Sequence, residues 1–200
     1  MRSLADLART LKFRAARRSL PGLVLLTDEI RLPDPLAAVA RLPAGSWVIL
    51  RHYGDPQREA LARSLAKLCR AKRLVLLVAG DFRLAVANGA GLHLPEGLVR
   101  QARPGWRLWK IKGRAPLTIA AHSRLALHHA RRAKADAALL SPVFPTNSHP
   151  GAKALGALRF RQWARGAAVP VYALGGINAS TARGLSGSGA AGLAAIGGLV

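Results

Sequence analysis

Several of the chain's short apolar runs end in side chains that can act as acids, bases or anion contacts. Arg51 follows the run WVIL, Asp81 follows LVLLVAG, and His122 follows LTIAA. An imidazole can give or take a proton near neutral pH, and a guanidinium suits a phosphate or a carboxylate. His122 also precedes Ser123, a residue type that caps helices. This is a place for a catalytic imidazole, although backbone hydrogen bonds could equally hold a histidine there.

Two glycine pairs close the last two apolar runs. Gly175 and Gly176 follow VPVYAL, and Gly197 and Gly198 follow GLAAI. Glycine lets main-chain N–H groups approach an anion closely, and barrels bind phosphate at the ends of their last two strands. Each pair could instead serve only a tight turn. Their occurrence at both strand ends favours a phosphate site.

Eight runs of β-branched and aliphatic residues alternate with helical segments, the pattern of βα units around a parallel sheet. The runs are residues 23–28, 47–53, 73–81, 91–95, 117–123, 137–144, 169–177 and 192–199. Eight strands suit a closed (β/α)8 TIM barrel. An open doubly wound sheet would alternate in the same way, but the turn TDEIRLPDP after the first run lacks its G-x-G-x-x-G. The sequence predicts one compact α/β barrel over residues 21–200, preceded by a basic helix or arm over 1–20.

Capping residues mark three helix starts. Asp55 and Pro56 predict the start of a helix whose apolar face holds Ala60, Leu61, Leu65 and Leu68. Ser123 predicts the start of a second helix, which ends in a strongly basic turn. Asn178 or Ser180 opens the last helix.

Composition indicates a folded chain without a membrane span. Half of its 200 residues are hydrophobic, yet no apolar run approaches the roughly 20 residues that cross a bilayer. The single cysteine, Cys69, allows no internal disulfide, and the N-terminus lacks a secretory pattern. We expect a cytoplasmic protein with Cys69 buried in a helix.

The net charge of +22 means that anionic partners must be considered. Its 31 Lys and Arg residues are spread over most predicted helices, which favours a solvated basic surface that steers phosphorylated metabolites. Nucleic-acid binding is the less favoured alternative, because neither a basic stripe with stacking aromatics nor a known module is present. No membrane partner is expected, and a homo-oligomer stays open.

From residue 74 onwards the chain resembles thiamine phosphate synthases and the related TenI thiazole tautomerases. The resemblance lies in GDFRLAVANGAGLHL, AAHS, SPVFPTNSHPG, VPVYALGGIN and GAAGLAAIGG, and before residue 74 only in LLTD and VILRHY. In such a synthase a pyrimidine methyl diphosphate loses pyrophosphate, and the nitrogen of a thiazole phosphate captures the resulting cation. The resemblance implies a magnesium ion, cations around the leaving group and a phosphate cradle.

The family's site is matched in part. The resemblance implies that Asp81 is a catalytic magnesium ligand and that Glu96 replaces an absent second Asp. Arg51 matches a diphosphate-binding Arg. The family has a Lys shortly after this Arg, whereas this chain has His52. The other implied diphosphate contacts are Thr146, Ser148, His149 and Lys153, with His149 in the place of a Lys. The implied thiazole phosphate cradle is Gly175, Gly176, Gly197 and Gly198, and the matching strand-five residues are His122 and Ser123.

Three functions follow from this partial match. The first is a thiamine phosphate synthase-like transferase acting on small phosphorylated substrates with Mg²⁺. The second is a TenI-type thiazole tautomerase that uses His122 as acid and base, without metal or diphosphate. The third is a barrel that binds a phosphorylated ligand without turnover, because some of the family's cations are replaced.

Overall fold

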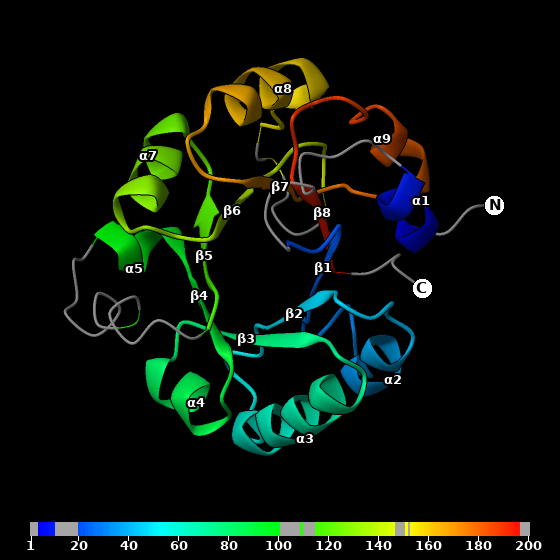
Figure 1. The fold of residues 1–200 in the computed structure, drawn as a ribbon, viewed down its shortest axis with the longest axis vertical. Coiled ribbons are helices and arrows are strands. Elements are labelled where there is room, and N and C mark those ends of the chain that lie inside the picture. The colour runs from blue at the N-terminus through cyan, green and yellow to red at the C-terminus, as the bar shows by residue number, and fades with distance from the viewer. Residues whose placement is uncertain are drawn as a thin grey trace.

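The computed structural model describes residues 4–10, 20–100, 109, 115–146, 151 and 153–196. Over these residues eight parallel strands pair in chain order, and β8 pairs with β1 to close a barrel (Figure 1). The strands are β1 (Leu23–Leu26), β2 (Trp47–Leu50), β3 (Val75–Ala79), β4 (Gly91–Leu94), β5 (Leu117–Ala121), β6 (Ala137–Leu140), β7 (Val171–Ala173) and β8 (Gly192–Ala195). The predicted TIM barrel is confirmed.

Helices form a ring around the strands (Figure 1). Those described are α1 (Leu4–Thr10), α2 (Pro35–Ala40), α3 (Arg58–Ala71), α4 (Phe82–Ala87), α5 (Glu96–Arg100), α7 (Arg124–Arg132), α8 (Gly156–Gly166) and α9 (Ala179–Arg183). In this ring α1 packs beside α9 and buries Leu4 and Leu7. The remainder of the expected N-terminal arm, residues 1–3 and 11–19, lies outside the described residues.

The strands separate two apolar layers because successive side chains of a strand point to opposite faces of the sheet. Trp47 and Ile49 of β2 pack inside the barrel with Tyr172 of β7, whose hydroxyl donates to the carbonyl oxygen of Pro21. Val48 and Leu50 face the helices instead. With both faces buried, most strands are continuous apolar runs without polar alternation, whereas β4 and β5 each contain one buried polar residue, His93 and Thr118.

The predicted runs contain all eight strands but extend a few residues past most of them. Polar residues such as Arg51 and Ser141 follow the last ladder positions and belong to the loops. The strand ends were therefore placed too late, at the boundary where the site is built.

Helix starts are predicted with mixed accuracy. The Ser123 hydroxyl accepts from the N–H of Ala126 and Asn178 caps α9, as expected. α3 begins at Arg58, because Asp55 and Pro56 form a turn before it. Its buried face includes Leu65 and Cys69, as expected, but Ala60 is exposed and does not belong to that face. Burial of Cys69 raises the pKa of its thiol to about 11.

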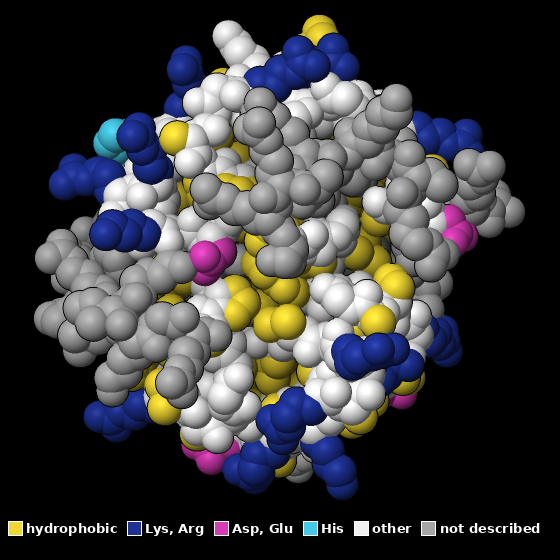
Figure 2. Space-filling model, viewed as in Figure 1, with side chains coloured by type: hydrophobic (Ala, Val, Ile, Leu, Met, Phe, Trp, Pro, Cys, Tyr) yellow, Lys and Arg dark blue, Asp and Glu magenta, His cyan; other side chains and the backbone are white. Residues whose placement is uncertain are grey.

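Lys and Arg side chains lie mostly around the periphery of the face in Figure 2, over the helices. This distribution agrees with a solvated basic surface. None of the helices in the described part of the chain is long and apolar enough to cross a membrane.

Candidate functional site

A cavity of about 320 Å³ opens at the C-terminal ends of the strands. Its described walls come from the loops after β1, β2, β6, β7 and β8, where barrels build their sites. The charged residues among the described lining are both cations. The lining consists of Arg31, Arg51, Ser141, Pro142, Pro145, Thr146, Leu174 to Asn178, Ala195 and Ile196.

Arg51 reaches this cavity because it continues the inward alternation of Trp47 and Ile49. Burial lowers the pKa of His93, inside the barrel, to about 3, and the positive charge of Arg51 contributes to this shift. The imidazole of His93 is therefore neutral at physiological pH and bonds to the hydroxyl of Thr118 at 2.9 Å. His93 belongs to the barrel core rather than to the cavity lining.

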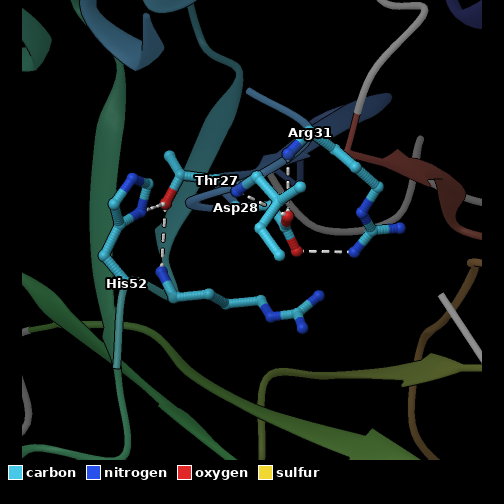
Figure 3. A network of polar contacts seen from close by, with 6 residues as sticks. Thr27, Asp28, Arg31 and His52 are labelled. Atoms are coloured by element: carbon cyan, nitrogen blue, oxygen red, sulfur yellow. Dashed lines mark hydrogen bonds and ion pairs between the residues drawn. The ribbon is translucent and has the colours of Figure 1, made fainter. Parts of the chain in front are cut away.

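The side chain of His52 points to the opposite face of the sheet from Arg51, and it is buried away from the cavity lining. Its Nδ1 lies 2.9 Å from the Thr27 hydroxyl, which also accepts the backbone N–H of Arg51 at 3.1 Å (Figure 3). The replacement of the family's Lys by His52 therefore puts no cation into the cavity. Instead, His52 and Thr27 fix the backbone at Arg51.

The Gly175–Gly176 pair meets the loop after β6 without room for side chains. Both glycines have positive φ, 92° and 63°. A Cβ on Gly175 would lie 2.8 Å from Cα of Pro142, and one on Gly176 would lie 2.5 Å from the carbonyl oxygen of Pro145. The pair therefore makes the turn and also lines the cavity. Gly197 and Gly198 lie outside the described residues.

The loop after β6 brings Thr146 to the cavity. Ser148 and His149 lie outside the described residues. Lys153 is exposed and is not part of the described lining. Of the four diphosphate contacts that the resemblance implies in this loop, only Thr146 is thus seen at the cavity.

His122 stands beside the cavity wall at Ser141. Its Nδ1 donates to the carbonyl oxygen of Ser141 at 3.0 Å, and the Ser141 hydroxyl lies 3.3 Å from the same nitrogen. The backbone N–H of His122 donates to Oε2 of Glu96 at 3.0 Å. A backbone carbonyl thus holds this imidazole, as one of the two sequence-based alternatives expected, and the catalytic role of His122 stays a prediction. Ser123 serves as the cap of α7.

The two carboxylates expected to hold magnesium already have protein partners. Oδ1 of Asp81 accepts the N–H of Leu84 at 2.9 Å as the cap of α4, and Oδ2 lies 3.8 Å from the guanidinium of Arg58. Glu96 holds the backbone of His122. Within the described ranges no group of three or more His, Cys, Asp or Glu side chains could hold a metal. The side chain of Asp81 stays partly exposed.

Sequence reasoning missed Arg31 as part of the site. Asp28 accepts the backbone N–H of Arg31 at 3.0 Å, and its other oxygen meets the guanidinium at 2.5 Å (Figure 3). The available signal was the turn TDEIR after the first strand, in which an Asp precedes an Arg by three residues.

The closed barrel and its cationic, glycine-walled mouth define a TIM-barrel protein with a site suited to phosphorylated ligands. Residues 23–199 match the family described as thiamine monophosphate synthase, and the chain belongs to this family.

Individual relatives agree with this assignment. The chain is 33% identical over 124 residues to a putative thiamine-phosphate synthase 2 of Aquifex aeolicus, covering 62% of this chain and 64% of that protein. It is 33% identical over 189 residues to the thiamine-phosphate synthase of Thioalkalivibrio sulfidiphilus, covering 90% and 88% of the two chains. A thiamine phosphate pyrophosphorylase structure from Pyrococcus furiosus shares the fold, with a TM-score of 0.73 at 24% identity over 90% of this chain and 87% of that one.

The family match and the relative from Thioalkalivibrio sulfidiphilus confirm the sequence-based assignment to the thiamine phosphate synthase-like transferases.

Proposed function

We propose that this chain joins a pyrimidine methyl diphosphate to a thiazole phosphate, with pyrophosphate as the leaving group. The carrying observation is that one cavity collects Arg51, Thr146 and the Gly175–Gly176 turn in a member of the thiamine monophosphate synthase family. The proposal includes a cytoplasmic location and small phosphorylated substrates.

Each wall of the cavity suits one part of this reaction. A guanidinium at Arg51 can take two diphosphate oxygens at once, and the Thr146 hydroxyl can donate to a third. As the carbon–oxygen bond breaks, its electron pair leaves with pyrophosphate, so fixed cations stabilise the leaving group. The thiazole nitrogen then forms the new carbon–nitrogen bond while its phosphate rests on the glycine turn. Ser148, His149, Lys153, Gly197 and Gly198 remain proposed substrate contacts.

Magnesium is part of the proposal. This ion is commonly bound by one or two carboxylates together with waters and substrate phosphates, rather than by a cage of protein ligands alone. Asp81 suits such a role because its side chain is 41% exposed while its cap bond uses one oxygen. Glu96 suits it less, since Oε2 accepts from His122. When bound, the ion would neutralise charge on the departing diphosphate.

The direct test mixes the purified chain with both substrates, with and without magnesium, and measures thiamine phosphate by chromatography. We expect product only with magnesium. Arg51→Gln should lower kcat/KM by at least about 100-fold, the scale of a lost charge-assisted contact to a developing anion. The matched control is Arg63→Gln, which removes an exposed cation from α3 and should leave the rate unchanged. No product in either condition refutes the proposal.

His122 supports a second candidate, the thiazole tautomerase. Because Nδ1 donates to Ser141, Nε2 is the ring nitrogen that would exchange a proton with a ligand. A tautomerase needs that exchange but neither diphosphate nor metal. Turnover of a thiazole phosphate tautomer in the presence of a chelator, with no thiamine phosphate formed, would favour this function over the synthase.

A further inference from the structure

Arg31 is a second cation at the cavity to which neither the resemblance nor the comparisons give a role. It comes from the loop between β1 and α2, whereas Arg51 follows β2. β1 and β2 are neighbours in the barrel, so the two guanidinium groups enter the same cavity from adjacent loops. The described lining contains no carboxylate.

Asp28 holds Arg31 with one oxygen on the backbone and the other on the side chain. Oδ1 accepts the backbone N–H groups of Ile30 at 3.3 Å and Arg31 at 3.0 Å, which closes the turn. Oδ2 meets Nη2 of Arg31 at 2.5 Å (Figure 3). One residue therefore sets both the backbone and the guanidinium of Arg31. Such a held side chain loses less rotamer freedom when it binds a ligand.

We propose that Arg31 is a further substrate-binding residue that contacts a phosphate or diphosphate group in the cavity, and that Asp28 is its positioning residue. The inference rests on the proposed function in taking the bound anion to be part of a substrate. A guanidinium has five N–H donors in a planar fork, so one edge can meet Asp28 while another meets a phosphate.

The competing explanation is that the pair merely closes the loop and that Asp28 cancels the charge of Arg31. The two explanations predict opposite changes in anion affinity for the Asp28→Asn variant. Simple charge addition predicts tighter anion binding when a nearby carboxylate is removed. Positioning predicts weaker binding, because the Asn oxygen still accepts the turn's N–H groups but no longer holds the guanidinium by charge.

The test is calorimetric titration of the full-length chain with inorganic pyrophosphate at fixed ionic strength. We expect Arg31→Gln to weaken binding about tenfold, the scale of one lost charge-assisted contact, and Asp28→Asn to weaken it about threefold or more. Arg31→Lys should restore part of the affinity, since a point charge replaces the fork. The control Arg41→Gln removes an exposed cation beyond the end of α2, away from the cavity lining, and should stay within about twofold of the unsubstituted chain.

The double variant Asp28→Asn/Arg31→Gln shows whether Asp28 affects pyrophosphate affinity through Arg31. If Asp28 acts through Arg31, Asp28→Asn should add no further loss to Arg31→Gln. Equal or tighter binding by Asp28→Asn, or an Arg31→Gln effect no larger than that of Arg41→Gln, would overturn the inference. So would an unsubstituted chain that does not bind pyrophosphate. Because binding requires no turnover, a chain with the expected binding pattern but no synthase activity would refute only the proposed function.

Discussion

A Cβ atom on Gly176 would lie 2.5 Å from the carbonyl oxygen of Pro145, so the loops after β7 and β6 meet backbone to backbone. This contact joins the glycine turn, the proposed phosphate site, to the loop that carries Thr146. Glycine at position 176 is therefore required by packing as well as by its positive φ of 63°.

Gly187 offers a matched control for this contact. It has the same φ of 63°, but a Cβ there would meet nothing within 4 Å. We expect Gly187→Ala to cost about 1 kcal/mol of unfolding free energy, from strain alone, and Gly176→Ala about 2–4 kcal/mol, from strain plus a displaced loop. Only Gly176→Ala should weaken thiazole phosphate binding. Urea unfolding and calorimetry measure the two effects, and equal behaviour of both variants would contradict the packing explanation.

Substitutions of His122 separate its two nitrogens. The amide N–H of Asn can approximate the Nδ1 donor to Ser141, whereas the amide of Gln lies nearer the position of Nε2. If the ring only orients the wall at Ser141, His122→Asn should keep synthase kcat within about tenfold. If Nε2 moves a proton, both variants should lose about 100-fold or more, the usual scale of general acid–base catalysis. Steady-state rates of both variants decide between these roles.

Asp81 and Glu96 should differ in their effect on magnesium dependence. Asp81→Asn keeps a good helix cap for α4 but removes the charge that a metal needs, so the magnesium concentration for half-maximal activity should rise at least about tenfold. Glu96→Gln retains an oxygen that can accept the backbone N–H of His122, and it should raise the half-maximal magnesium concentration less. Thermal unfolding checks that both variants stay folded. Unchanged metal dependence in both would argue against a carboxylate magnesium site.

The Asp28–Arg31 pair should stabilise the fold in a pH-dependent way. The side-chain hydrogen bond from Arg31 lowers the pKa of Asp28 from 3.8 to about 2. A carboxyl with a lowered folded pKa contributes stability that is present above its unfolded pKa and is lost as pH falls through the folded one. The difference in unfolding free energy between the unsubstituted chain and Asp28→Asn should be about 0.5–1 kcal/mol at pH 6 and should shrink between pH 4 and 2. Urea titrations across this range test it, and a pH-independent difference would mean that charge plays no part.

The sequence alone determined the barrel and predicted the end at which the candidate site lies. Apolar runs, strand alternation and capping residues are local patterns, and the structure contains the eight strands and the caps at Ser123 and Asn178, though not the helix start predicted at Asp55. Strand alternation also accounts for Arg51 turning inward while its neighbour His52 turns outward.

Only the tertiary structure decided which distant residues meet. The contact of Gly176 with Pro145, the Arg58 guanidinium beside Asp81 and the entry of Arg31 into the cavity all join separate loops or elements. Such distances depend on how the closed sheet sets neighbouring loops against one another, whereas periodicity along the chain describes one element at a time. For this reason the sequence could propose chemistry for Asp81 and Glu96 without revealing that both carboxylates already hold parts of the fold.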